Sequence, residues 1–375
     1  MNFQSLTDFL NTLPSLGVPG TDCVIYHKRK EVYRHQSGFM DIEQQIPMAL
    51  NAIYNMYSAT KPVTCTAALQ LYERGLFTLS DPLYAYIPAY KTMYIKENGS
   101  IRKAEKPILI RDLFTMTAGF DYNIRSDAIT SVKRNTNGAA PTLAVVRALA
   151  TEPLSFEPGT RFQYSLCHDV LGGLVEVLSG KTLGQYCREH IFEPLGMQDT
   201  TFLPTEETEE RLAPLYMHYP DKKRTVKISS QNVFRFGTAY ESGGGGLLST
   251  TEDSIRFVDM LASGGRTQQG ELVLSRGTIS LMRTNQVSPT ALYDFGWTHM
   301  AGYGYGLGVR TMIDKEKSGS LGSLYEFGWG GAAGAYMLAD TERELAVFYT
   351  QHMLESMEAY IHPRLRNYVY EGIDA

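Results

Sequence analysis

The sequence contains little cysteine and no segment typical of a secreted or membrane-spanning chain. The four cysteines, at positions 23, 65, 167 and 187 of 375 residues, form no C-x-x-C pair. We therefore expect reduced thiols, with neither a disulfide framework nor a cysteine-ligated metal. No run approaches the roughly 18 apolar residues of a membrane span. No basic residue precedes the first apolar run, so the sequence predicts a cytoplasmic protein without a signal peptide.

Charge of one sign is not concentrated anywhere in the chain. Lys and Arg number 35 and Asp and Glu number 40, which gives a formal net charge of −5. The single short basic cluster, at 222–224, is typical of a solvated loop. Nucleic acids and anionic membrane surfaces select for clustered Lys and Arg. The sequence therefore predicts neither of them as a partner.

The sequence does contain enough apolar material, 43% of its residues, for a large core. Its length corresponds to roughly two domains. Apolar periodicity predicts strands near both ends, terminal helices with a possible break at Pro363, and a mostly helical middle. The predicted strands are 22–27, 31–35, 334–339 and 344–349, and the clearest helices are 3–13, 169–178 and 353–370.

This distribution predicts an α/β (α+β) fold in which both chain ends build one sheet. We expect a discontinuous sheet domain from residues 1–75 plus 290–375 and a mostly helical domain from 76–289. The active-site cleft is expected between the two, because small-molecule sites prefer domain interfaces.

The first candidate for chemistry is the pair Ser58 and Lys61, at the start of a helix that runs to about residue 73. Residues three apart on a helix are neighbours, so the hydroxyl and the amine can meet. Free N–H groups and the positive end of the dipole lie at a helix N-terminus and favour an oxyanion. Burial is expected to push the lysine toward its neutral form, which can take the serine proton.

Two further segments qualify as parts of a site. Tyr164 follows a turn and precedes the helix at 169–178, so its phenol can point into a cleft and shuttle a proton. Trp329, Gly330 and Gly331 precede the predicted strand at 334–339. Glycines at a strand edge let a substrate approach the backbone, whose N–H groups can serve as oxyanion donors.

Taken together, these segments resemble the serine β-lactamase and penicillin-binding protein superfamily, on its class C and family VIII carboxylesterase branch. That family has S-x-x-K on a helix, then Y-x-N or Y-S-x, then K-T-G or variants such as H-G-G and W-G-G. Here the three motifs are Ser58 to Lys61, Tyr164 to Leu166 and Trp329 to Gly331. The stretches 111–119, 156–172, 243–253 and 305–308 are also similar, so the resemblance spans about residues 20 to 350.

The resemblance implies a β-lactamase-like fold and a role for each motif residue. Ser58 would be the acylated nucleophile, and Lys61 would be its base or the group that tunes it. Tyr164 would share in proton transfer and protonate the leaving group. The backbone N–H groups of Ser58 and Ala332 would form the oxyanion hole. Trp329, Gly330, Gly331 and Leu166 would contact the substrate, which would be a small ester or amide, and no cofactor or metal would be needed.

Two departures from the family pattern bear on the substrate. Leu166 replaces an asparagine that contacts the amide of lactams, and Trp329 replaces the third-motif lysine. Both losses favour an uncharged ester over a penicillin. A second candidate for the third motif, Lys317-Ser318-Gly319, lies in a polar stretch away from the strong strand.

The sequence therefore predicts a serine hydrolase that forms an acyl-enzyme, with small esters as substrates. Two alternatives stay open. The same residues could serve a β-lactamase, D-peptidase, amidase or acyltransferase, or the fold could be a non-catalytic binding domain. Acyl and alcohol specificity and the oligomeric state are left undetermined by the sequence.

Overall fold

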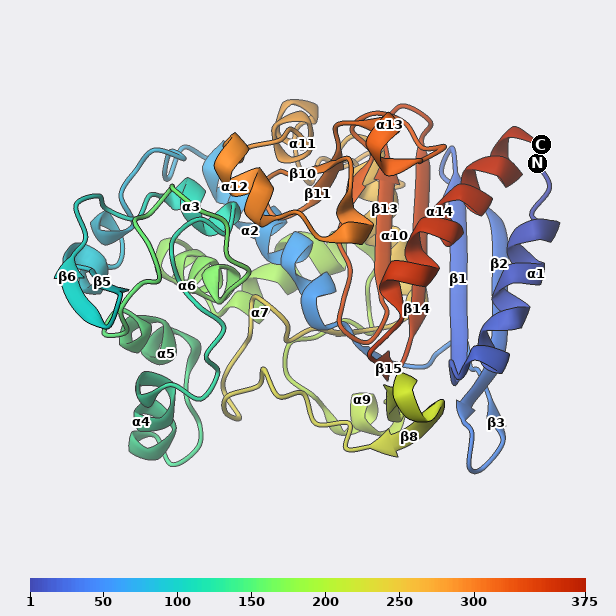
Figure 1. Cartoon of the computed structure of the whole chain (residues 1–375), viewed down its shortest axis with the longest axis horizontal. Helices are drawn as coiled ribbons and strands as arrows, with labels where there is room; N and C mark the ends of the chain where they lie inside the picture. Colours follow the sequence, from blue (N-terminus) through green and yellow to red (C-terminus); the bar gives the residue numbers. More distant parts are fainter.

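The centre of the molecule is a sheet built from both ends of the chain. A computed structural model describes all residues from Met1 to Ala375. The sheet strands are β1 (Gly20–His27), β2 (Lys30–Asp41), β3 (Ile46–Pro47), β10 (Tyr303–Tyr305), β11 (Arg310–Met312), β12 (Phe327–Gly328), β13 (Tyr336–Asp340) and β14 (Leu345–Gln351). Their order is β10-β11-β12-β13-β14-β1-β2-β3, with every neighbouring pair antiparallel (Figure 1). The predicted sheet from both chain ends is thus confirmed.

The chain also forms fourteen α-helices, some of which cover the sheet while others, such as Asp127–Asn135 and Thr142–Leu149, lie away from it (Figure 1). They are α1 (Gln4–Thr12), α2 (Lys61–Glu73), α3 (Ile110–Phe114), α4 (Asp127–Asn135), α5 (Thr142–Leu149), α6 (Cys167–Ser179), α7 (Leu183–Cys187), α8 (Glu193–Leu195), α9 (Glu206–Glu210), α10 (Thr251–Ala262), α11 (Arg276–Met282), α12 (Pro289–Asp294), α13 (Lys315–Ser318) and α14 (Glu358–Asp374). None of them is both long enough and apolar enough to cross a lipid bilayer.

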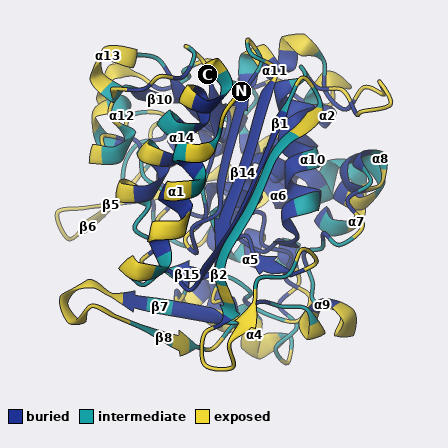
Figure 2. Cartoon of the chain, turned by 90° about the vertical axis from the view of Figure 1, so that its right-hand side faces the viewer, coloured by how far each residue is buried: buried dark blue, intermediate teal, exposed yellow.

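Both faces of the sheet are covered, because side chains alternate between them along each strand. In β1, Cys23 and Ile25 face the cluster under α1 and α14, whereas Val24 and Tyr26 join the main core. The helix α10 packs against β14 on that second face. Figure 2 shows β1 and β14 in dark blue, with α1 and α14 on one side and α10 on the other, whereas β2 is mostly of intermediate burial. A strand buried on both sides has few positions for polar residues, which explains the apolar run at 345–349.

The rest of the chain is less purely helical than its sequence predicts. The helix α2 packs against α6. Three small sheets accompany the helices: β4 (Tyr54–Asn55) with β9 (Leu248–Ser249), β5 (Tyr94–Glu97) with β6 (Ser100–Lys103), and β15 (Met353–Leu354) with β7 (Leu215–Tyr219) and β8 (Arg224–Ile228). Because α10 lies on the sheet although it belongs to the middle of the chain, the boundaries at 75 and 290 stay predictions.

The predicted break at Pro363 does not occur. The helix α14 continues through Pro363, although proline removes one backbone hydrogen bond. Ile361, Leu365 and Val369 of this helix are fully buried against the sheet. Their packing keeps the helix whole, because tertiary contacts readily outweigh one lost backbone bond.

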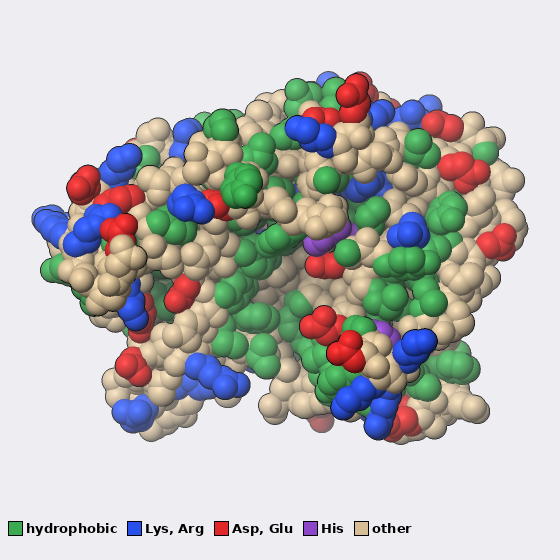
Figure 3. Space-filling view, viewed as in Figure 1, with side chains coloured by type: hydrophobic (Ala, Val, Ile, Leu, Met, Phe, Trp, Pro, Cys, Tyr) green, Lys and Arg blue, Asp and Glu red, His purple; other side chains and the backbone are tan.

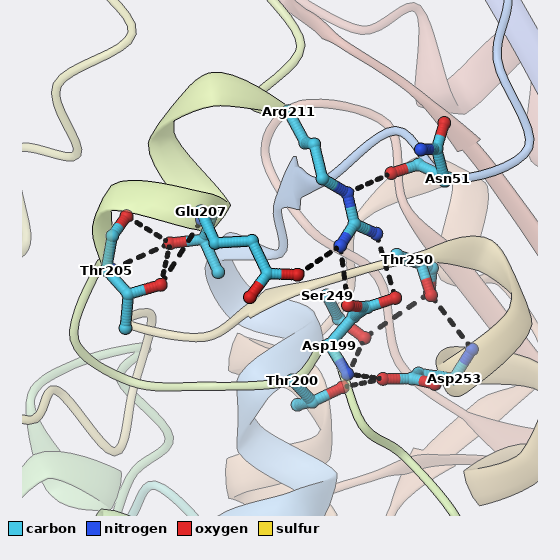
Figure 4. A network of polar contacts seen from close by, with 10 residues as sticks. Asn51, Asp199, Thr200, Thr205, Glu207, Arg211, Ser249, Thr250 and Asp253 are labelled. Carbon is cyan, nitrogen blue, oxygen red and sulfur yellow. Dashed lines mark hydrogen bonds and ion pairs between the residues drawn. The ribbon is translucent and has the colours of Figure 1, made fainter.

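A polar network fixes the strand that leads to Ser58 (Figure 4). The Arg211 guanidinium donates to the Asn51 carbonyl and to both carboxylate oxygens of Asp199. The Asp199 backbone N–H in turn donates to Asp253, in the first turn of α10. Thr250 caps that same turn by accepting from the Asp253 backbone. The segment before β4 is therefore tied to α10 and so to the central sheet.

We predict that the protein loses stability as the pH falls below about 6.5, because three histidines are buried in neutral form. Burial lowers the pKa of His168 and His362 to about 3 and that of His352 to about 4. The unfolded chain binds protons near pH 6.5 and the folded chain does not, so protonation favours unfolding. Each histidine then contributes up to about 1.4 kcal/mol of destabilisation per pH unit.

The melting temperature between pH 7.5 and about 5 measures this effect. His352→Gln should flatten the dependence, because it removes one of the three groups. Burial raises the pKa of Glu176 to about 7, which acts in the opposite direction, so the comparison with the variant decides. A His352→Gln protein whose melting temperature depends on pH as steeply as that of the wild type would contradict the assignment of a neutral buried His352.

Candidate active site

Ser58 lies on a sharp turn between β4 and α2. The strand β4 pairs with β9, and Tyr57 then adopts a positive φ of 45°. A positive φ is unusual for a residue with a large side chain and stores strain that the surroundings must hold. Ser58 follows in a single 3₁₀ turn, Tyr57–Thr60, which continues directly into α2. The turn leaves the Ser58 side chain partly exposed at the edge of a cavity.

The Lys61 amine is fully buried and contacts three oxygen atoms. Its Nζ lies 3.0 Å from Ser58 Oγ, 3.3 Å from the Tyr122 hydroxyl and 2.6 Å from the Gly244 carbonyl. The carbonyl can only accept, whereas the two hydroxyls can donate or accept. The same geometry therefore suits an ammonium that donates three times and a free amine that accepts the Ser58 proton. Ser58 can thus lose its proton to Lys61 without movement of the amine.

Asp169 holds the glycine loop that supplies the Gly244 carbonyl. It lies in the first turn of α6, and its carboxylate accepts from the hydroxyls of Tyr240, at 2.8 Å, and Ser242, at 2.7 Å. A Cβ on Gly244 would lie 2.4 Å from Asp169 Oδ2, so only glycine allows this approach. The carboxylate therefore fixes the loop at 242–246 against α6 and sets where Lys61 finds its acceptor.

Tyr164 stands between the Lys61 amine and Trp329. The Lys61 Nζ lies over the Tyr164 ring, 4.5 Å from its centroid. The Tyr164 hydroxyl accepts from the Trp329 Nε1 at 3.1 Å, so its own proton can be donated elsewhere. The ring stacks on Tyr122 and on Trp329, with centroids 5.6 and 5.7 Å apart. These contacts leave the phenol little freedom to turn, and Tyr164 lines the same cavity as Ser58.

The electrostatics of Lys61 differ from the expectation that burial alone would make it neutral. Burial lowers the pKa of the amine, but Tyr122, Tyr164 and Asp169 raise it, and the net result lies above the ordinary value. Burial also raises the pKa of the Tyr122 phenol. The direction of this shift favours an ammonium at rest, and an ammonium must lose a proton before it can act as a base.

The loop from Trp329 to Gly334 passes directly beside the turn that holds Ser58. A Cβ on Gly331 would lie 2.2 Å from the Met56 carbonyl oxygen, so this approach requires glycine. The backbone N–H groups of Ser58 and Ala332 donate to no other group of the chain. Both residues line the same cavity. Two free N–H donors beside a nucleophile are what an oxyanion hole requires.

Most of the predicted site residues come together around one cavity of about 180 Å³. Its lining includes Ser58, Tyr164 and the backbone from Trp329 to Ala332. Figure 3 shows apolar side chains around a hollow near the middle of the face of the molecule that is drawn in Figure 1. No group of three or more His, Cys, Asp or Glu side chains is arranged to hold a metal ion.

Leu166, which was expected to contact the substrate, and Lys317, the less favoured alternative for the third motif, both lie outside this cavity. Leu166 does not line the cavity: it is 3% exposed and packs in the core at the start of α6. Its backbone N–H donates to the Asp121 carbonyl, which holds this segment in place. The Leu166 side chain therefore contributes to core packing and does not contact the cavity. Lys317 lies in α13 with 76% of its side chain exposed and pairs with Asp314. It belongs to the surface and not to this site.

Sequence reasoning missed Tyr122 and the pair of Asp169 and Gly244. Tyr122 is one of 24 tyrosines, and nothing in its neighbourhood distinguishes it. It follows the stretch 111–119 by three residues, and only the fold brings it to Lys61. The glycine run at 243–246 is evident in the sequence, but nothing in the sequence indicates that Gly244 packs against Asp169 of α6.

A serine that is hydrogen-bonded to a buried lysine, beside a phenol and two free N–H donors, defines a serine hydrolase on this fold. The chain belongs to the β-lactamase family, whose profile matches residues 6–368. It is 32% identical over 343 residues to the protein Rv1367c of Mycobacterium tuberculosis, which covers 88% of this chain and 84% of that one.

Two further relatives carry activity in their names. The chain is 28% identical to the esterase EstB of Burkholderia gladioli over 94% of this chain and 90% of EstB. It also matches the structure of EstCE1, described as a hydrolase with promiscuous acyltransferase activity. That match has a TM-score of 0.81 and 25% identity, and it covers 98% of each chain.

We predict that the reactivity of Ser58 increases with pH across the neutral and alkaline range. The base is free only after the cluster around Lys61 loses a proton, and the pKa of Lys61 lies above its ordinary value. Below that pKa the free-amine fraction grows about ten-fold per pH unit. The rate of labelling by a fluorophosphonate probe, followed by intact mass, should therefore rise steadily from pH 6.5 to 9.

Two controls accompany this measurement. Ser58→Ala should abolish labelling, and Lys61→Ala should remove most of the pH dependence together with most of the rate. A labelling rate that is constant above pH 7 would show that the cluster has already lost its proton in the resting enzyme.

Proposed function

We propose that this protein is a carboxylesterase that cleaves small esters through an acyl-enzyme on Ser58. The observation that carries the proposal is the Ser58–Lys61 hydrogen bond beside Tyr164 and two free N–H groups. The names of EstB and EstCE1 support an ester as substrate. So does the absence of a third-motif cation and of the lactam-binding asparagine, since Trp329 and Leu166 stand at those places.

In the proposed reaction Lys61 and Tyr164 move protons, and two backbone N–H groups hold the oxyanion. The Lys61 amine takes the Ser58 proton as Oγ attacks the ester carbonyl, and the carbonyl electrons move to the oxygen held by the Ser58 and Ala332 N–H groups. The tetrahedral intermediate collapses and breaks the bond to the alcohol oxygen. Tyr164 gives that oxygen a proton and regains one from the Lys61 ammonium. Water then attacks the acyl-enzyme by the same path and releases the acid.

Deacylation by an alcohol instead of water would make the same site an acyltransferase. The description of EstCE1 favours this as a second activity. The oxyanion donors and the base would be shared, so the balance between the two depends on which acceptor reaches the acyl-enzyme.

We predict that the protein hydrolyses para-nitrophenyl acetate and butyrate and that Ser58→Ala abolishes this activity. Nitrocefin is the matched lactam substrate. Fast nitrocefin turnover without ester cleavage would reject the carboxylesterase in favour of a β-lactamase. A wild-type protein that neither cleaves these esters nor accepts a fluorophosphonate label would be a binding domain.

We predict different losses for the two tyrosines that face Lys61. Tyr164→Phe removes the proton donor for the leaving group, so kcat for an alkyl ester should fall by about 10². The loss should be smaller for the para-nitrophenyl ester, whose leaving group needs little protonation. Tyr122→Phe removes only a partner of Lys61 and should affect both esters equally. Equal losses for both esters with Tyr164→Phe would contradict its role as proton donor.

A further inference from the structure

A second cavity borders the loop that supplies the Ala332 N–H group. Its volume is about 520 Å³, and Ala332 is the only residue that it shares with the cavity beside Ser58. Tyr57, the residue before Ser58, also lines it. One of the two oxyanion donors therefore borders both cavities, and the proposed hydrolysis uses only the first of them so far.

The walls of this second cavity are apolar. They include Leu215 from β7, Ile228 from β8, Leu354 from β15, and Val233 and Phe234 from the loop that follows β8. Seven of its nine lining residues are apolar and none is charged, so an apolar occupant would gain the most by leaving water. Val233 is 62% exposed and would be covered by such an occupant.

The chain holds these walls in a fixed position relative to Ser58. The Met353 backbone N–H of β15 donates to the Ala333 carbonyl at 3.2 Å, so the wall strand is bonded to the oxyanion loop. The Phe234 ring lies edge-on to Tyr57, with centroids 6.1 Å apart, and to Tyr122, with centroids 5.3 Å apart. The second cavity is therefore formed by the same contacts that hold the nucleophile and its surroundings.

The position of Tyr164 decides which half of an ester each cavity can take. Tyr164 lines the first cavity and not the second. It protonates the alcohol oxygen in the proposed reaction, so the alcohol half must lie in the first cavity. The acyl carbon and the alcohol oxygen are on opposite sides of the carbonyl carbon. With the carbonyl oxygen at the Ser58 and Ala332 N–H groups, the acyl chain then points away from Tyr164.

We propose that the second cavity holds the acyl group of the ester, and that this group is an uncharged aliphatic chain longer than acetyl. The inference rests on the proposed esterase function and specifies its acyl group. Each methylene that enters an apolar cavity strengthens binding about two-fold to four-fold. A charge at the end of the chain would lose its water without gaining a partner, because no lining residue carries a charge.

Esters that share one alcohol and differ in the acyl chain test this assignment in the wild-type enzyme. From para-nitrophenyl acetate through butyrate and hexanoate to octanoate, kcat/KM should rise about two-fold to four-fold per methylene until the cavity is filled. Mono-para-nitrophenyl glutarate has the chain length of the pentanoate and a terminal carboxylate. Its kcat/KM should be at least about ten-fold below that of the pentanoate.

A charge placed in the cavity wall should remove the chain-length preference. Val233→Asp changes an exposed side chain, so the protein should fold, and the ratio of kcat/KM for octanoate to that for acetate should fall about ten-fold or more. The matched control is Ile101→Asp on β6. Ile101 is 63% exposed and lines neither cavity, so this variant should keep the wild-type ratio.

Binding can be measured without catalysis in the Ser58→Ala protein. Butanoate, hexanoate and octanoate are the acid products of the same esters, and calorimetry gives their dissociation constants. Their affinity should increase about two-fold to four-fold per methylene. Adding Val233→Asp to the Ser58→Ala protein should abolish this increase, and adding Ile101→Asp should not.

The outcomes separate the two proposals. If the esters are cleaved but kcat/KM does not rise with acyl length, or rises equally in Val233→Asp, the acyl cavity is wrong and the esterase stands. If no ester is cleaved but alkanoate affinity rises with chain length and depends on Val233, the cavity is supported and the esterase is overturned. Alkanoate affinities that do not change with chain length, without cleavage of any ester, would overturn both.

Discussion

The buried amine of Lys61 is the constraint on which the rest of the site depends. An ammonium removed from water needs acceptors on every side, and these come from distant parts of the chain: Ser58 beside it, Tyr122 before α4, and Gly244 between β8 and β9. Each partner then needs support of its own. The Gly244 loop is held by Asp169, so α6 contributes to the site through a residue that never touches the cavity.

The loop that precedes β13 of the central sheet lies against the turn that holds Ser58. The backbone at Gly331 approaches the Met56 carbonyl so closely that a methyl group would collide with it. This contact joins the edge of β13 to the turn that holds Ser58. The polar network through Arg211 and Asp199 fixes the segment before β4, which leads into that turn. The position of the Ala332 N–H group relative to Ser58 is therefore set by the close contact between the loop at Gly331 and the turn at Met56.

How much of this could be predicted from the sequence depends on how local the signal is. Ser58 and Lys61 are three residues apart on a helix, so their contact follows from helical geometry. The sheet strands alternate in the expected way, and both terminal hairpins were visible. Tyr122 and Asp169 act through contacts that only the fold creates, so neither spacing nor composition indicates them. The prediction that Leu166 contacts the substrate is not supported, because its side chain is buried in the core just before α6.

The motif positions alone describe the cavity incompletely. Arg310 on β11 and Arg366 on α14 line the same cavity as Ser58, although neither belongs to one of the three motifs. The Arg310 guanidinium is held in place by the protein itself, because it lies 4.4 Å from the Tyr336 ring centroid and 3.9 Å from Glu326. Replacement of the third-motif lysine by Trp329 therefore does not leave the cavity without a cation, since the sheet and the last helix each supply one.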